Sequence, residues 1–112
     1  MDIRLKTMPF ELEGRKYDLC CNMNVLADVQ EAFDGSIQKA LSNRSPVKGV
    51  LAFLAAMCND YADAQGWDVR YTARQLGRLL PPTALKSVCA GVMELVSSAL
   101  GGEDEEGGAE KN

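Results

Sequence analysis

The stretch FELEGRKYDLCCNMNVLADVQEAFDGSI, residues 10–37, contains the two patterns that decide the fold. Its first half, with Met8 before it, alternates apolar and polar residues on both sides of Gly14. Alternation of period two around a glycine is typical of a β-hairpin with one buried face. Pro9 lacks an amide donor, so the first strand should begin near it or lie at an edge. We therefore predict a hairpin over residues 8–21, packed on helices because a lone hairpin is marginally stable in water.

The second half of the stretch predicts helix. Asn22 or Asn24 can cap the first turn through its side-chain oxygen, and apolar residues recur at helical spacing over residues 25–33. Gly35 should end this helix, because glycine readily adopts the left-handed conformation found after a helix. A short helix, capped by the serine at its start, is expected over residues 36–41.

Three further helices are predicted downstream of a polar loop. Ser45 and Pro46 have the residue types preferred at the cap and the first position of a helix. Thr72 and Gln75 have the spacing of a capping box, in which each side chain bonds the backbone amide of the other residue. Pro81 and Pro82 should halt the resulting short helix, and Pro82 should form the first turn of the last one. The three predicted helices cover residues 46–64, 73–80 and 82–100.

Two of these helices carry a continuous apolar stripe, which predicts that they form the core. The stripe residues are Val47, Val50, Leu51, Leu54, Cys58 and Tyr61 in the first, and Leu85, Val88, Cys89, Val92, Val96 and Leu100 in the last. The predicted fold class is therefore α+β and mainly α, with an N-terminal β-hairpin packed on about five helices. Residues 1–101 are expected to form a single globular domain.

The charge is distributed unevenly along the chain. Residues 101–112 hold five of the 16 acidic and one of the 12 basic residues, which leaves 11 of each in the body. Residues 102–112 contain almost nothing but glycine and charge, so we expect a disordered acidic tail. The neutral body has no net attraction for phosphate, which argues against a nucleic-acid partner. The longest apolar stretch, residues 49–58, is too short to span a bilayer and no signal-peptide core is present, so we expect no membrane partner and a cytoplasmic location.

The sequence lacks the motifs of common catalytic sites. It contains no histidine, no glycine-rich phosphate loop and no nucleophile elbow. Cys20 and Cys21, just before a helix start, are the only cysteines placed to become an activated thiolate, and buried apolar roles are the simpler interpretation of all four. The carboxylate pairs Asp60 with Asp63 and Glu11 with Glu13 are typical of solvated faces. We predict that the chain is not an enzyme and has no cofactor and no metal site.

Four residues are candidates for partner binding. Trp67 is one, because tryptophan is enriched in binding hot spots, although folding back onto the core is the simpler interpretation. Val92, Met93 and Val96 are the others, because they spread the apolar surface of the last helix beyond one narrow stripe. Burial of both sides of that helix is the alternative explanation.

Residues 71–95 also resemble a helix-turn-helix, a short capped helix followed by a turn and a longer helix. A recognition helix needs basic and polar residues near its start. Here that start is Pro-Pro-Thr-Ala-Leu-Lys, residues 81–86, with one base and no arginine. A small DNA-binding regulator is therefore the alternative function.

The order of features resembles that of small phage tail assembly chaperones. In that family a glycine-turn hairpin leads into a helix with the pattern N-x-L-x-x-h-x-x-x-F-x-G-S-h, where h is apolar. The matching residues here are Asn24, Leu26, Val29, Phe33, Gly35, Ser36 and Ile37. The T-x-x-Q-L helix from Thr72 to Leu76, the last helix and the acidic end are also similar, so the resemblance covers about residues 3–112. The Cys20–Cys21 pair and the connector containing Trp67 depart from the family pattern.

The resemblance implies a role in tail morphogenesis. Such chaperones bind the tape measure protein, a long and mostly helical chain, and recruit tail tube subunits. They act in the cytoplasm of the infected cell, and the family tends to form homo-oligomers. We therefore expect a protein-binding function directed at amphipathic helices.

Overall fold

A computed structural model describes residues 6–41 and 46–100 of the chain. The described residues form a two-stranded antiparallel sheet followed by five α-helices, which confirms the predicted α+β, mainly helical class. The elements are β1 (Met8–Leu12), β2 (Arg15–Leu19), α1 (Met23–Ala32), α2 (Ile37–Ala40), α3 (Pro46–Gln65), α4 (Ala73–Leu79), the 3₁₀ turn η1 (Pro82–Ala84) and α5 (Leu85–Ala99).

The hairpin closes through a two-residue turn. Glu13 and Gly14 both have positive φ, 51° and 80°, which is the type I′ geometry that matches the twist of paired strands. Phe10 pairs with Tyr17 across the strands, and the residues of this face are the ones that become buried, Leu12, Tyr17 and Leu19. The strands are shorter than the predicted range of 8–21, because β2 ends at Leu19.

The first two helices begin at the expected caps. Of the two candidates for α1, Asn22 is the cap: its side-chain oxygen accepts from the Val25 amide at 3.0 Å. The helix ends where Asp34 and Gly35 adopt positive φ, 56° and 84°. The hydroxyl of Ser36 then caps α2.

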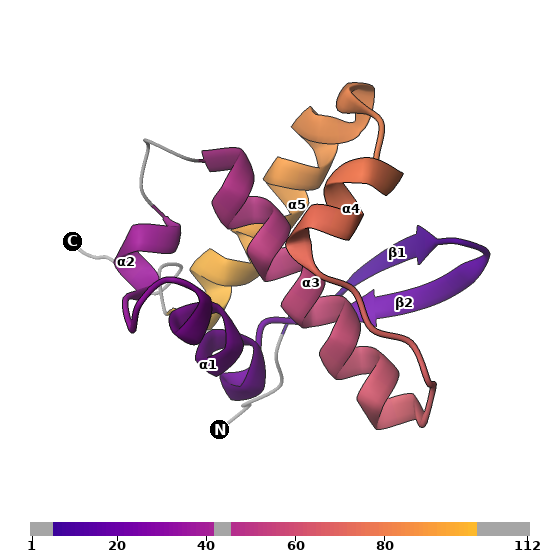
Figure 1. The fold of residues 1–112 in the computed structure, drawn as a ribbon, viewed down its shortest axis with the longest axis horizontal. Helices are drawn as coiled ribbons and strands as arrows, with labels where there is room; N and C mark the ends of the chain where they lie inside the picture. The colour runs from indigo at the N-terminus through magenta and orange to yellow at the C-terminus, as the bar shows by residue number, and fades with distance from the viewer. Residues whose placement is uncertain (1–5, 42–45, 101–112) are drawn as a thin grey trace.

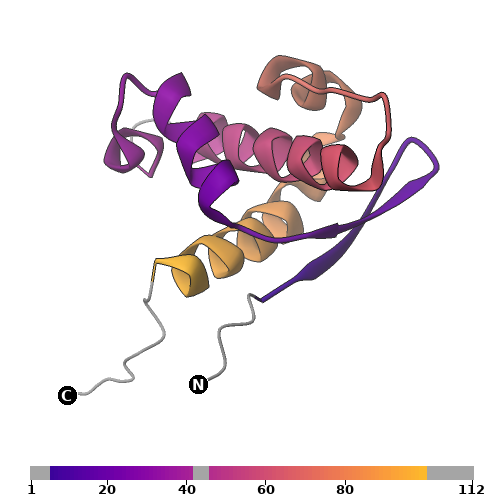
Figure 2. The ribbon, with the colours of Figure 1, turned by 90° about the horizontal axis from the view of Figure 1, so that it is seen from below.

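Helix α3 is the central element of the molecule (Figure 1). Helices α1, α2, α4 and α5 and strand β2 all contact it. In Figure 2, α5 passes beneath α3 and α4 lies above it. The core is therefore built around the buried face of α3, whose largest fully buried side chains are Phe53, Leu54 and Met57.

The last helices confirm the capping box and refine the boundaries. The Thr72 hydroxyl accepts from the Gln75 amide at 3.1 Å, and the Gln75 side chain accepts from the Thr72 amide at 2.8 Å. Helix α4 ends at Leu79, one residue before the predicted end, because Leu80 precedes a proline and is extended. Pro82 opens a 3₁₀ turn that leads into α5, where a first turn of α-helix was predicted.

Several predictions fall outside the described residues. These are the Ser45 cap, the disordered acidic tail of residues 102–112 and the domain boundary at residue 101. Within the described residues, no single helix has the length and hydropathy to cross a bilayer; α4 with residues 82–99 meets that test only as a pair, bent by 104°.

Candidate functional site

An apolar groove of about 200 Å³ lies where α3, α4 and the start of α5 meet. We call it the α3–α4–α5 groove. Its walls come from three segments far apart in the sequence: the first turns of α3, the end of α4 with the following prolines, and the first turns of α5. The lining residues are Val47, Val50, Leu51, Gly77, Leu80, Pro81, Pro82, Ala84, Leu85 and Val88. None of these side chains is charged, so the groove suits an apolar ligand.

The two prolines build the groove by redirecting the chain. Pro81 and Pro82 cannot continue α4, and the chain leaves that helix at an angle of 104°. Gly77 contributes no side chain to the α4 wall, and a Cβ placed there would lie 3.5 Å from Cδ1 of Leu51. The absence of that side chain leaves part of the groove volume open.

Two large hydrophobic side chains of the groove remain exposed to solvent. Val47 is 43% exposed and Leu85 is 42% exposed. Each is the first member of an apolar stripe that farther along its helix is buried, in α3 at Val50 and Leu54 and in α5 at Val92 and Val96. The two stripes therefore extend beyond the core at the same place, and together they present apolar surface that the rest of the described chain does not cover.

The structure does not bring the four predicted partner-binding residues together on one surface. Val92 and Val96 are 0% and 1% exposed, so the partner-binding role assigned to them does not fit this fold, and their side chains belong to the core. The wide apolar surface of α5 is explained by burial, the alternative stated above. Met93 is exposed, and it is the only one of the three α5 residues that a partner can reach.

Trp67 packs in a cluster of three aromatic rings. Its ring meets that of Tyr17 edge-on at a centroid distance of 5.4 Å and that of Tyr61 at 5.6 Å. The guanidinium of Arg15 lies over the same ring, 5.6 Å from its centroid, in a cation–π contact. The half-buried tryptophan thus ties the connector after α3 to the hairpin, which supports the core role over the partner-binding role.

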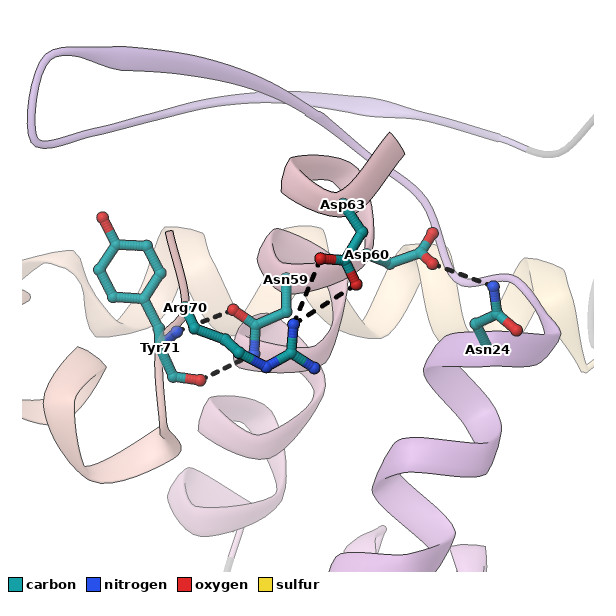
Figure 3. Close-up of polar contacts among 6 residues, drawn as sticks. All are labelled: Asn24, Asn59, Asp60, Asp63, Arg70 and Tyr71. Atoms are coloured by element: carbon teal, nitrogen blue, oxygen red, sulfur yellow. Dashed lines mark hydrogen bonds and ion pairs between the residues drawn. The ribbon is translucent and has the colours of Figure 1, made fainter. Parts of the chain in front are cut away.

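The polar groups near the end of α3 are engaged in structural contacts (Figure 3). Asp60 accepts from Asn24 at 3.1 Å, as Figure 3 shows. It also accepts from Asn22 at 2.6 Å, and the two bonds anchor the start of α1. Asp63 pairs with Arg70 at 3.3 Å. The two carboxylates predicted to lie on a solvated face are therefore bound to different partners and do not form an acid–base pair.

Glu13, from the other carboxylate pair, is also engaged in a structural contact. It accepts a hydrogen bond from the Tyr71 hydroxyl at 2.8 Å. Within the described residues, no group of three or more histidine, cysteine or acidic side chains is arranged to hold a metal ion.

Of the four cysteines predicted to be buried, Cys21 and Cys58 lie in the core, whereas Cys20 and Cys89 are only half-buried. Burial raises the pKa of Cys21 to about 11 and that of Cys58 to about 12. The pKa of Cys20 is raised as well, by burial first and then by the negative charges of Asp60 and Asp18. An activated nucleophile needs a lowered pKa, so the environment of Cys20 and Cys21 opposes thiolate chemistry.

The groove itself was not predicted from the sequence, although part of its signal was present. The sequence places Val47 and Leu85 on the apolar stripes and predicts the stop at Pro81–Pro82. What was missing was the spatial relation between the first turns of α3 and α5. Comparisons with models of known protein families, with curated proteins and with solved structures found no match.

Proposed function

We propose that this protein is a cytoplasmic phage tail assembly chaperone that binds amphipathic helices of a tape measure protein and recruits tail tube subunits. The observation that carries the proposal is the α3–α4–α5 groove, with Val47 and Leu85 exposed at its edge. The resemblance of residues 24–37 to that family directs the proposal to tail assembly. The proposal includes self-association, which the resemblance implies.

The dimensions of the groove favour a protein segment over a small molecule. Small-molecule sites usually enclose about 300–1,000 Å³, and this groove is smaller, about 200 Å³. Helix-in-groove binding needs room for only a few anchor side chains at a spacing of three or four residues. Burying one valine or leucine side chain contributes about 1.5–3 kcal/mol, so two or three anchors offset a substantial part of the roughly 4–15 kcal/mol that association costs.

Co-purification from cells expressing this protein with a tape measure protein and a tail tube protein tests the proposal. The wild-type chain should retain the long helical protein, and Leu85→Glu should lose it because a charge is placed at the apolar edge. Met23→Glu is the matched control, since Met23 is 79% exposed at the start of α1 and does not line the groove. Equal retention by the two variants, or no retention by the wild type, would contradict the proposal.

The helix-turn-helix alternative is supported by one observation. The angle of 104° between α4 and residues 82–99 lies within the roughly 90–120° of such motifs. However, Lys86 is the only basic residue of α5, whereas DNA readout relies on several basic and polar side chains. Salt-sensitive retention of duplex DNA, together with failure to bind any helical partner, would favour this alternative.

A further inference from the structure

The charges beside the α3–α4–α5 groove have one sign. Lys48 and Lys86 directly follow Val47 and Leu85, the two large hydrophobic lining residues that remain open to solvent, and both lysines are exposed. Helix α4, which forms the third wall, carries the exposed cation Arg74 one turn before the lining residue Gly77. Arg78 is exposed as well, but it lines a separate hollow that includes Glu13. The described residues contain no ion pair or hydrogen bond made by any of these four side chains.

Acidic residues are absent from the groove side of these helices. Helix α3 has no acid before Asp60, and α4 has none at all. The single acid of α5 is Glu94, in the second half of the helix, where it binds Lys6 at 2.7 Å. The groove therefore has an apolar floor between basic flanks, although the body of the chain as a whole is neutral.

We propose that the groove receives an amphipathic helix whose apolar stripe is flanked by acidic residues. This inference rests on the proposed function and specifies the chemistry of the partner. The apolar floor needs apolar anchor side chains, and carboxylates beside those anchors would meet Lys48 and Lys86, each of which follows a lining residue in sequence. A phosphate backbone would satisfy the lysines but has no apolar group to fill the floor, so the groove favours a protein helix over nucleic acid.

The probes for the test are three synthetic peptides of roughly 18 residues, or five helical turns. All three carry the same leucine stripe at helical spacing, and the residues beside the stripe are glutamate, glutamine or lysine. Binding to the full-length protein is measured by fluorescence anisotropy. At about 0.1 M salt the glutamate peptide should bind about tenfold more tightly than the lysine peptide, and the difference should nearly vanish at about 1 M salt, where charges are screened within a few ångströms.

Charge-reversal variants test whether the lysines beside the groove cause the preference for the glutamate peptide. Lys48→Glu and Lys86→Glu should each lower the affinity for the glutamate peptide severalfold and raise the affinity for the lysine peptide. Lys16→Glu makes the same change in net charge on the hairpin, away from the lining residues, and should leave the preference unchanged. Circular dichroism spectra that overlay that of the wild type show that each variant is folded.

The outcomes separate this inference from the proposed function. Equal binding of the three peptides, lost in Leu85→Glu, would overturn the acidic-flank inference and leave the proposed function standing. Failure of all three to bind would count against both. Duplex DNA that binds more tightly than the glutamate peptide and is released by Lys86→Glu would replace the protein partner with nucleic acid. A dimer in analytical ultracentrifugation that Leu85→Glu dissociates would make a second copy of the chain the occupant.

Discussion

Asn59 on α3 holds the backbone of Tyr71 through two hydrogen bonds, each 2.8 Å long (Figure 3). Its amide nitrogen donates to the Tyr71 carbonyl and its amide oxygen accepts from the Tyr71 amide. One side chain thus provides the hydrogen-bond partners of both the amide and the carbonyl of Tyr71, a connector residue that lies outside any helix or strand. The contact fixes the path from α3 to α4, and hence the position of the α4 wall of the groove.

Replacing Asn59 by leucine should therefore destabilise the fold. Both partly buried backbone groups of Tyr71 would lose their partner, at an expected cost of about 1–3 kcal/mol in the free energy of unfolding. Urea denaturation followed by circular dichroism measures this cost. Asn24→Ala is the control, because it removes one exposed hydrogen bond to Asp60 and should cost no more than about 0.5 kcal/mol. A similar loss of stability in both variants would contradict a larger contribution from the Asn59–Tyr71 contact.

Two neighbouring residues of α5 should respond differently to truncation. Val92→Ala leaves a cavity in the core and should lower the free energy of unfolding by about 1–3 kcal/mol. Met93→Ala, at an exposed position, should change it by less than about 0.5 kcal/mol. The melting temperatures of the two variants measure this difference. Equal melting temperatures would contradict the burial of Val92.

Two glycines should give stability changes of opposite sign when replaced by alanine. Gly77→Ala should stabilise α4 by about 0.5–1 kcal/mol, since the new methyl group makes an ordinary contact with Leu51. Gly49→Ala should cost about 1–3 kcal/mol, because its Cβ would overlap the backbone carbonyl of Ala40 and force α2 away from α3. Differential scanning calorimetry should show melting temperatures above and below that of the wild type; a rise for Gly49→Ala would contradict the close approach.

Alkaline pH should weaken the fold through the buried thiols. The pKa values of Cys21 and Cys58 are raised from 9.0 to about 11 and about 12, so above pH 9 the unfolded chain loses these protons more readily than the native state. The stabilisation is complete below pH 9 and declines as the pH rises towards 12. The midpoint of urea unfolding, measured from pH 8 upwards, should fall.

Substitution of both cysteines by alanine is the reference for this prediction. The double variant should be less stable at pH 8 because it loses buried volume, and its stability should decline less steeply with pH. Native Cys58 should also react slowly with a thiol reagent at pH 8, and rapid modification without unfolding would contradict its burial.

Local patterns were sufficient to predict most of the element order. The type I′ turn at Glu13–Gly14, the Asn22 cap and the capping box at Thr72 involve residues at most three positions apart. Each is stabilised by bonds within one turn of chain, so the sequence around it contains the necessary information. The boundary errors, at the end of β2 and the end of α4, are of one or two residues, where helices and strands fray.

Long-range geometry decided which apolar side chains remain exposed. Helical spacing placed Val47, Leu85 and Val92 alike on apolar stripes, yet only Val92 is buried. Periodicity defines the face of a helix but not how far along that face a neighbouring helix extends. That distance depends on the angle at which α3, α4 and α5 cross.

The sequence by itself determined the hairpin, the helix order, the caps and the absence of a recognised catalytic motif, because these follow from interactions between near neighbours in the chain. Only the tertiary structure decided that Val92 and Val96 belong to the core, that Trp67 closes an aromatic cluster, and that an apolar groove with basic flanks forms beside Pro81–Pro82. Each of these depends on segments distant in sequence, whose contacts arise only when the helices pack together.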